Sequence, residues 1–300
     1  MNASPVLSII IVNYNGGELI QRCLAAIFEH PPRRHFEIIV IDNASGDGSP
    51  ELIAENFPDV RLIRSDVNGG LCKAFNHGAR VTTAPYLLSL DNDTRVLENA
   101  LDELLEFMEN NPDVGGVGSN LYNPDMSLQY ASRRFPGALS ALFGRRSLLT
   151  RLFPNNPVSH HDLMTDCRYD DAPFEVHWHS AASLLLRREA LERIGGWNES
   201  YFVYWSDADL CARMRAAGYR IYNVPKSRIV HDETLSGRKG PRHPRMVIDF
   251  HEGAYRFYRT HRLRWRFHPL APIAWLGLRL RAAALILYDY VRARADSKSR

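Results

Sequence analysis

Cysteine is scarce in this sequence of 300 residues, and its placement excludes two kinds of site. The four cysteines, Cys23, Cys72, Cys167 and Cys211, are scattered, and no two of them form a CxxC pair. That spacing supports neither a zinc site nor a disulfide framework and is typical of a protein from a reducing cytoplasm. A chain of this length can bury a substantial hydrophobic core without either.

Two common phosphate-binding motifs are also missing. No GxGxxG follows the first apolar run, and GxxxxGK[ST] does not occur anywhere in the chain. Both a dinucleotide-binding enzyme and a P-loop enzyme are therefore disfavoured. A phosphorylated ligand would have to be held in another way, for which a bound metal ion is the obvious means.

Strong net charge and the pattern of a signal peptide are not found in this sequence either. The formal net charge is +3, which is too small to indicate a nucleic-acid partner. The first apolar run, Val6–Val12, is short and has no basic region before it, so we expect a strand there and not a signal peptide. We therefore expect a cytoplasmic protein that does not bind nucleic acid.

What the sequence does contain is an alternation of apolar runs and helical patterns. Val6–Val12, Glu37–Ile41, Val60–Ile63 and Tyr86–Leu90 resemble buried strands, with helical periodicity between them. This alternation predicts βαβ units and a mostly parallel sheet flanked by helices, which is an α/β fold. Polar loops at the carboxyl ends of such strands meet at one edge of the sheet, where open α/β folds bind ligands. The predicted crevice is formed by the loops 13–15, 42–47, 68–76 and 91–93.

The fourth strand ends in Asp91-Asn92-Asp93, and two carboxylates this close repel each other unless a cation lies between them. Carboxylate oxygens suit Mg²⁺ or Mn²⁺. An isolated Asp-X-Asp is more often a simple turn, but three other polar loops converge on this one. A later strand ends in His231, which is either a third metal ligand or an ordinary hydrogen-bonded histidine.

A second acidic centre begins the helix after residue 205. Asp209 has the i, i+4 spacing for an ion pair with Arg213. Asp207 follows Tyr204 and Trp205, and such a partly desolvated carboxylate suits a general base. The two aromatic rings would give a platform for a sugar ring.

The middle and the end of the chain are less regular. Residues 130–172 lack periodicity and are expected to form a mobile loop within a catalytic domain of residues 1–240, whose acceptor-side part is about 120–240. Basic side chains of this loop, which either close over a donor or are solvated, are Arg133, Arg134, Arg145 and Arg146.

Residues 241–300 are expected to form a basic, amphipathic helical tail. Residues 251–300 contain eleven Lys or Arg against three acidic residues. Arg279 and Arg281 interrupt the apolar segments 267–278 and 282–291, which favours an interfacial helix at a membrane surface over a spanning one. The alternatives are packing on the catalytic domain and a contact between two copies of the chain.

Taken in order, several motifs resemble the inverting GT-A glycosyltransferases of family 2, and most of all the bacterial rhamnosyltransferases and the galactofuranosyltransferase branch. The resemblance covers about residues 6–235. The motifs are Ile9–Asn15, Asp42–Ser49, Asn68–Gly78, Leu90–Thr94, Ser180–Ala182 with Arg187-Arg188, Ile194–Glu199, Tyr201–Arg213 and His231.

The resemblance implies a GT-A fold, a nucleotide-sugar donor, a divalent cation (Mg²⁺ or Mn²⁺) and an acceptor hydroxyl on a cell-envelope glycan precursor, lipid-linked in many relatives. The donor it favours is dTDP-rhamnose, with galactofuranosyl or hexosyl transfer as alternatives. The enzyme would then work at the inner face of the plasma membrane.

Individual roles follow from the same resemblance. Asp207 would be the catalytic base, Asp93 the direct metal ligand together with His231, and Asp91 a ligand of the ribose or of a metal-bound water. Donor contacts would come from Asn13, Tyr14, Asn15, Asp42, Asn68, Gly69, Asn76, Asp91 and Asn92. Acceptor contacts would come from Trp178, His179, Tyr204, Trp205 and Ser206. The chain departs from the family at Ser206, where Glu or Asp is usual.

Two other functions compete with this one. A sugar-phosphate nucleotidyltransferase would need a basic, glycine-rich loop after the first strand, and residues 13–17 contain no basic side chain. A non-catalytic glycan-binding relative would be expected to lose Asp93, Asp207 or His231, and all three are present.

Overall fold

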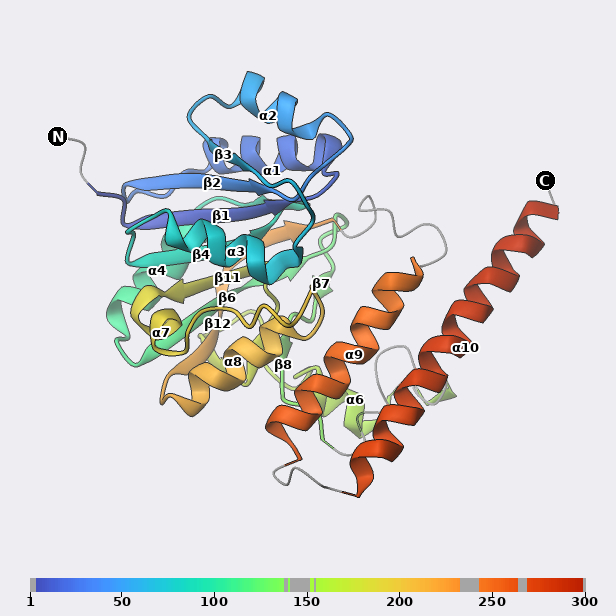
Figure 1. Cartoon of the computed structure of the whole chain (residues 1–300). Helices are drawn as coiled ribbons and strands as arrows, with labels where there is room; N and C mark the ends of the chain where they lie inside the picture. Colours follow the sequence, from blue (N-terminus) through green and yellow to red (C-terminus); the bar gives the residue numbers. More distant parts are fainter. Residues whose placement is uncertain are drawn as a thin grey trace.

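A central sheet of ten strands organises the molecule (Figure 1). The computed structural model describes residues 4–137, 140, 152, 153, 155–232, 243–263 and 269–298. The first part of the chain forms β1 (Leu7–Asn13), α1 (Gly17–Glu29), β2 (Phe36–Asp42), α2 (Ser49–Asn56), β3 (Arg61–Arg64), α3 (Gly70–Arg80), β4 (Tyr86–Asp91), β5 (Thr94–Val96) and α4 (Ala100–Asn110). The rest forms β6 (Val114–Tyr122), β7 (Leu128–Gln129), β8 (Ser132–Arg133), α6 (Pro157–Asp162), β9 (Phe174–Val176), β10 (Trp178–His179), β11 (Ser183–Arg187), α7 (Arg188–Arg193), α8 (Ser206–Ala216), β12 (Arg220–His231), α9 (Pro244–His261) and α10 (Leu270–Lys298).

The main path of the sheet has the order β3-β2-β1-β4-β11-β6-β12-β5. β3, β2, β1 and β4 are parallel, as the βαβ pattern predicts. β11 is antiparallel to both β4 and β6. β6 ends at the carboxyl edge, and β11 starts at that edge and runs the other way. The α/β prediction is confirmed, and the sheet is mixed beyond β4.

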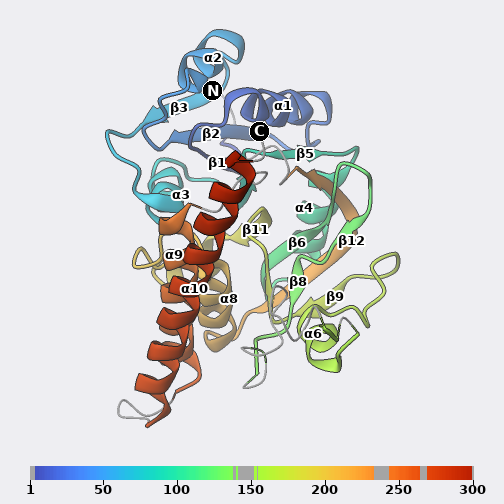
Figure 2. The ribbon, with the colours of Figure 1, turned by 90° about the vertical axis from the view of Figure 1, so that its right-hand side faces the viewer.

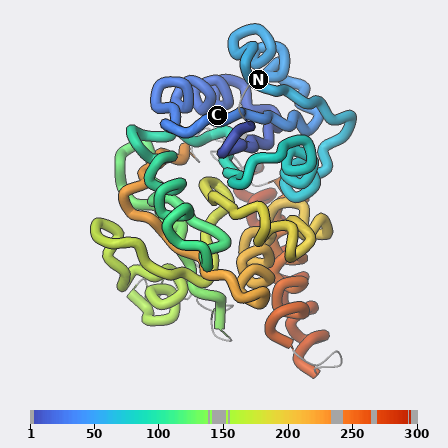
Figure 3. Tube along the Cα trace, turned by 90° about the vertical axis from the view of Figure 1, so that its left-hand side faces the viewer, coloured from blue at the N-terminus to red at the C-terminus, as the bar shows by residue number. Residues whose placement is uncertain are grey.

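Both faces of the sheet are covered, which explains why β1, β2 and β4 are mostly apolar. Ile9 and Ile11 of β1 belong to one core cluster with α1 and α4, whereas Ile10 belongs to another with α3. α4 lies against β6 and β12 on the side shown in Figure 3. Because successive side chains of a strand point to opposite faces, a strand buried on both sides needs an unbroken apolar run.

The strand registers place the polar ends of β1, β2 and β4 at one level. Asn13 is paired with Asp42 across β1 and β2, and Val12 is paired with Asp91 across β1 and β4. These pairings create the edge on which the expected crevice depends.

The end of the chain forms two long helices beside the sheet (Figure 2). α9 packs against α8 and α10. α10 is a single helix that continues through Arg279 and Arg281, so the arginines do not divide it. Its segment Leu270–Arg292 is, among the described residues, the one helix long and apolar enough to cross a membrane by length and composition, and 11% of the tested window is buried.

Apolar side chains lie on several sides of α10 and do not form a single stripe, in contrast to the amphipathic pattern expected. Those exposed to solvent include Leu270, Ile273, Trp275, Leu276, Leu280, Leu287 and Val291. A helix that is apolar all round normally lies in a protein core or in lipid.

Candidate active site

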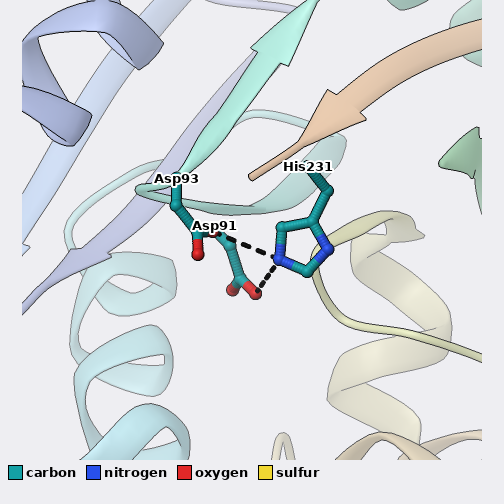
Figure 4. A group of neighbouring side chains, drawn as sticks. All are labelled: Asp91, Asp93 and His231. Carbon is teal, nitrogen blue, oxygen red and sulfur yellow. Dashed lines mark ion pairs between the residues drawn. The ribbon is translucent and has the colours of Figure 1, made fainter. Parts of the chain in front are cut away.

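Asp91, Asp93 and His231 converge at the carboxyl edge of the sheet (Figure 4). The Nε2 atom of His231 lies 3.2 Å from Asp93 Oδ1 and 3.8 Å from Asp91 Oδ2. The ligand atoms of the three residues all lie within 4.8 Å of one another. Asp93 and His231 are buried, whereas the Asp91 side chain is 39% exposed. Two carboxylates and one imidazole on a single point fit Mn²⁺ or Mg²⁺.

Gln129 of β7 sets the orientation of the His231 ring. His231 Nδ1 lies 3.0 Å from Gln129 Oε1, and Gln129 Nε2 donates back to the His231 carbonyl oxygen at 2.8 Å. An amide oxygen can only accept, so Nδ1 carries a proton, and Nε2 is the ring nitrogen that faces the aspartates. Such a partner is typical of a metal-binding histidine. The sequence carries no signal for Gln129, because its role depends on a contact across 102 positions.

Strand pairing and one turn bring the histidine to the aspartates. In the antiparallel pair β12 and β5, His231 lies opposite Thr94. The Asp232 N–H donates to the Asp93 carbonyl oxygen at 2.9 Å. The Thr94 hydroxyl donates to the Asp91 carbonyl oxygen at 2.7 Å and closes the turn between the two carboxylates.

A buried polar network joins the ends of β1, β2 and β4. Asn92 Nδ2 donates to Asn13 Oδ1 at 3.0 Å, and Asn13 Nδ2 donates to Asp42 Oδ1 at 2.9 Å. Asp42 also accepts from the N–H and the hydroxyl of Ser45. Most of the hydrogen-bond acceptor positions of its carboxylate are therefore occupied, and the residue is 2% exposed. This geometry gives Asp42 a role in holding the donor loops and leaves one acceptor direction for a base.

The loop after β1 is fixed to the loop after β2. The Asn15 N–H donates to Ser45 Oγ at 2.9 Å, and Asn15 Oδ1 accepts from the Gly46 N–H at 2.8 Å. Tyr14 remains 52% exposed on the same loop. Asn15 is exposed as well, but its side-chain oxygen is already engaged by Gly46.

Asn68 and Gly69 lead into α3 at the point where the chain touches residue 202. Asn68 Oδ1 accepts from the Gly70 N–H at 3.0 Å, and the Leu71 N–H donates to the Phe202 carbonyl oxygen at 2.8 Å. Gly70 has φ +83°, and a β-carbon there would lie 2.5 Å from that oxygen. This turn thus requires glycine and ties the donor loop to the segment that precedes Asp207.

Asp207 begins the first turn of α8 and is half-buried. Burial raises its pKa from the ordinary 3.8 to about 6, against the opposing hydrogen bonds from the Ala208 and Ala181 N–H groups and the charge of Arg133. A carboxylate with a pKa near neutrality is suited to take a proton from a hydroxyl group.

Two consecutive residues, Ala181 and Ala182, connect this carboxylate to the metal-type cluster. The Ala181 N–H lies close enough to the Asp207 carboxylate to lower its pKa. The Ala182 carbonyl oxygen accepts from the Asp91 N–H at 3.1 Å. Asp91 and Asp207 are 116 positions apart in the sequence (207 − 91). Both therefore lie against one short segment before β11.

Two of the expected acceptor residues are not available to an acceptor. His179 is 0% exposed, because its ring fills the space above Gly118 and its Nε2 lies 3.2 Å from Asn223 Oδ1. Ser206 is 1% exposed, and its hydroxyl donates to the Val203 carbonyl oxygen at 2.6 Å. Each side chain makes its polar contact inside the fold, which speaks against the predicted contacts with an acceptor; those contacts stay predictions.

Other residues expected to contact the donor or the acceptor are partly engaged in contacts within the protein. Asn76 does not point to a ligand: its amide donates to the Trp197 carbonyl oxygen and accepts from the Trp197 N–H, which indicates a scaffolding role and speaks against donor binding. Trp178, Tyr204 and Trp205 are half-buried. Trp178 Nε1 donates to the Arg134 carbonyl oxygen at 3.2 Å, so one edge of this ring is already fixed.

The basic side chains of the expected mobile loop have different surroundings. Arg133 lies over the Trp178 ring and is close enough to Asp207 to lower its pKa. Arg134 makes two hydrogen bonds to Asp166, both 3.0 Å long. Arg145 and Arg146 lie outside the described residues.

Comparisons with known proteins agree with this geometry. The model of the family described as glycosyl transferase family 2 matches residues 8–195. An N-acetylglucosaminyl-diphospho-decaprenol L-rhamnosyltransferase from Mycobacterium tuberculosis is 28% identical over 307 aligned positions, which cover 97% of this chain and 96% of that protein.

Two solved structures share the fold. The mannosyltransferase PcManGT from Pyrobaculum calidifontis, in complex with GDP-Man and Mn2+, matches with a TM-score of 0.59 and 20% identity over 100% of this chain and 77% of that one. GalNAc-T7 with UDP, GalNAc and Mn2+ matches with a TM-score of 0.59 and 14% identity over 94% of this chain and 55% of that one. At these identities the likeness concerns the fold, and the predicted GT-A architecture is confirmed.

Proposed function

The chain belongs to glycosyl transferase family 2 and is a glycosyltransferase, and on that premise we propose that it is a metal-dependent, inverting rhamnosyltransferase. The donor would be dTDP-rhamnose, and the acceptor a hydroxyl group of a lipid-linked glycan precursor. The observation that carries the proposal is the link through Ala181 and Ala182, which sets a carboxylate of raised pKa beside a metal-type cluster.

The metal-type cluster supports the proposed cation dependence. Asp93 and His231 would hold the ion, and Asp91, which is more exposed, would reach it directly or through a water molecule. When bound, the cation supplies positive charge that neutralises a departing diphosphate. Because the cation carries that charge, the chain needs no acidic side chain to protonate the leaving group.

The chemical step itself would belong to Asp207. Its carboxylate accepts the proton of the acceptor hydroxyl while that oxygen forms a bond to the anomeric carbon of the donor. The bond between this carbon and the diphosphate oxygen breaks, with its electron pair leaving on the nucleoside diphosphate. Attack from the face opposite the leaving group inverts the configuration, as in inverting glycosidases.

The choice of donor and acceptor is supported by the mycobacterial relative, whose name gives rhamnosyl transfer to a decaprenol-linked sugar and whose likeness extends over nearly the whole chain. An acceptor of this class sits in a membrane. The exposed apolar helix α10, with Trp275, Tyr288 and Tyr290 among its exposed aromatic residues, supports a position at the inner face of the plasma membrane. A contact between two copies through α10 is the competing use of this helix.

A donor screen tests the proposal. The purified protein is incubated with Mn²⁺, a short-chain N-acetylglucosaminyl-diphospho-prenol and one donor at a time, and release of nucleoside diphosphate is measured. We expect release from dTDP-rhamnose to exceed that from UDP-galactofuranose and UDP-hexoses at least tenfold, and to stop when EDTA is added. A preference for a UDP-sugar would overturn the donor assignment, and full activity in EDTA would overturn the metal dependence.

A further inference from the structure

One face of α9, which lies outside the region matched by the family model, contacts the turn that carries Asp207. The four residues of this face, Asp249, Gly253, Phe257 and His261, follow one another at intervals of four. At 3.6 residues per turn, such residues share one side of a helix. All four touch the segment 204–209, which surrounds the proposed base.

Two of them hold the main chain before Asp207. Asp249 Oδ2 accepts from the Tyr204 N–H at 3.1 Å. A β-carbon at Gly253 would lie 2.6 Å from the Tyr204 carbonyl oxygen and 3.2 Å from Trp205 Cδ1, so the helix backbone itself rests on this turn. Trp205 has φ +69°, a conformation that a bulky residue adopts only when its surroundings enforce it.

The third residue fixes the Trp205 side chain. Phe257 is 1% exposed, and the centroids of its ring and the Trp205 ring are 5.4 Å apart. Phe250 of the same helix packs on both aromatic residues of the turn. The centroid of its ring lies 5.5 Å from that of Tyr204 and 5.8 Å from that of Trp205. Both aromatic residues expected to form a sugar platform are thus oriented by α9.

The fourth residue reaches the charged group that follows Asp207. His261 Nε2 donates to Asp209 Oδ1 at 2.8 Å, and Arg213 Nε donates to Asp209 Oδ2 at 2.7 Å. The latter is the i, i+4 pair that the sequence predicts. Arg213 Nη1 also donates to the carbonyl oxygens of Ile194 and Gly196.

The buried position of Asp209 makes its hydrogen-bond partners necessary. Asp209 is 0% exposed, and a carboxylate so deeply buried is tolerated only when both oxygens are paired. Burial alone would raise the pKa of Asp209, but the hydrogen bond from His261 and the charge of Arg213 outweigh it and hold that pKa below its usual range. Both sides of Asp207 along the chain are therefore anchored to α9, through main-chain contacts before it and an ion pair after it.

We propose that α9 is a positioning element of the active site, in which Asp249, Gly253, Phe257 and His261 together fix the direction of the Asp207 carboxylate. The proposal rests on Asp207 being the base. It makes α9 part of the catalytic unit, although the helix lies beyond residue 240, where the sequence predicted the tail to begin. Ordinary helix packing would need apolar contacts only, whereas three of these four contacts reach main-chain atoms or a buried charge.

The test compares three single variants of the full-length chain. His261→Ala removes the donor to Asp209, His261→Gln retains an N–H at a similar reach, and Gly253→Ala pushes against Tyr204. We expect kcat to fall 10- to 100-fold in His261→Ala and Gly253→Ala and to recover to within about threefold in His261→Gln. Binding of dTDP with Mn²⁺, measured by calorimetry, should stay within twofold and supplies the fraction of folded protein. Gly277→Ala in α10, where a β-carbon meets open space, is the matched control with unchanged kcat.

The outcomes separate this proposal from the proposed function. If kcat per folded enzyme is unchanged in His261→Ala and Gly253→Ala while Asp207→Asn is inactive, α9 is only a packing helix and the positioning role is wrong. A loss of kcat that His261→Gln does not restore would overturn the role of the His261 hydrogen bond. If Asp207→Asn itself is active, the base assignment fails and the positioning role fails with it.

Discussion

Asp207 differs from an ordinary surface aspartate because its first helical turn is packed against the segment before β11. Burial raises its pKa to about 6, whereas Asp209 two residues later is held below its usual pKa by partners on α8 and α9. Two carboxylates two residues apart thus have different environments, and only one of them is suited to exchange a proton near neutral pH.

Removing the proton acceptor should stop transfer without loss of donor binding. In Asp207→Asn we expect kcat to fall at least about 1,000-fold, because the amide cannot accept the hydroxyl proton. A loss of this size lies in the upper part of the range for general-base catalysis. The affinity for dTDP with Mn²⁺, measured by calorimetry, should change less than twofold. Full activity in this variant would remove Asp207 from the mechanism.

The pH dependence of kcat should reflect the same group. With a pKa of about 6, the carboxylate is deprotonated above that value and kcat should be level, whereas below it kcat should fall about tenfold per pH unit. The contribution of Asp207 to folding stability changes with pH in the opposite direction. Since the folded state holds this proton more tightly than the ordinary pKa of 3.8 would, the contribution of Asp207 to stability is lost as pH rises from about 4 to about 6. A rate profile that is flat between pH 5 and pH 8 would contradict the assignment.

Gln129 should affect metal affinity and not the protein fold. Gln129→Ala frees the His231 ring to rotate and removes the group that fixes its tautomer, so we expect Mn²⁺ to bind about 10- to 100-fold more weakly. Mn²⁺ binding is measured by electron paramagnetic resonance without any substrate. Gln21→Ala on α1 serves as a control of the same substitution type, and equal Mn²⁺ affinity in both variants would exclude the role of Gln129.

At the scale of elements, a glycine in β6 leaves space for a bulky side chain of β10. β6 contains Gly118, and a β-carbon there would lie 2.2 Å from the ring of His179. The buried, hydrogen-bonded His179 has its pKa lowered to about 4 by burial, which marks it as a neutral core residue at physiological pH. The glycine in β6 therefore makes room for a histidine that the sequence alone suggested as a ligand.

Gly118→Ala should destabilise the protein by about 2 kcal/mol or more, because the ring of His179 has no space to move into. The free energy of unfolding is measured by urea denaturation. Gly46→Ala, where a β-carbon meets nothing within 4 Å, is the control and should change it by less than about 0.5 kcal/mol. Similar values for the two variants would show that the packing around His179 is loose.

On the scale of the whole molecule, different elements carry different parts of the proposed function. The sheet carries the loops expected to bind the donor and the metal-type cluster. α9 contacts the turn of the proposed base, and α10 packs on α9 with most of its apolar surface exposed. This arrangement places the most exposed apolar helix one helix away from the proposed catalytic turn.

Deletion of residues 265–300 should lower co-sedimentation with liposomes that contain anionic lipid by at least fivefold, because it removes α10 and most of the basic residues of the tail. The measurement compares the full chain and the truncated chain on phosphatidylglycerol and phosphatidylcholine vesicles. Size-exclusion chromatography of both chains, run in parallel, shows whether α10 instead joins two copies. Unchanged co-sedimentation would assign α10 to packing or to a dimer contact.

The sequence alone determined the parts of this protein that depend on local pattern. The apolar runs of the strands and the periodicity between them predicted the α/β fold, because a strand buried on two faces is mostly apolar on both. The i, i+4 spacing of Asp209 and Arg213 likewise predicted their ion pair. The two aspartates were predicted to hold a metal ion, and His231 was either a third ligand, as the family resemblance implied, or an ordinary hydrogen-bonded histidine; the structure brings the three together.

Only the tertiary structure decided which polar residues remain free to act. His179, Ser206 and Asn76 have the composition of ligand-binding residues, but contacts with distant segments consume their polar atoms. Gln129 and His261 gained their roles through partners 102 and 52 positions away, and no local pattern can reveal such pairs. A side chain's chemistry is written in the sequence, whereas its availability depends on burial and on hydrogen-bond partners that exist only once the chain has folded.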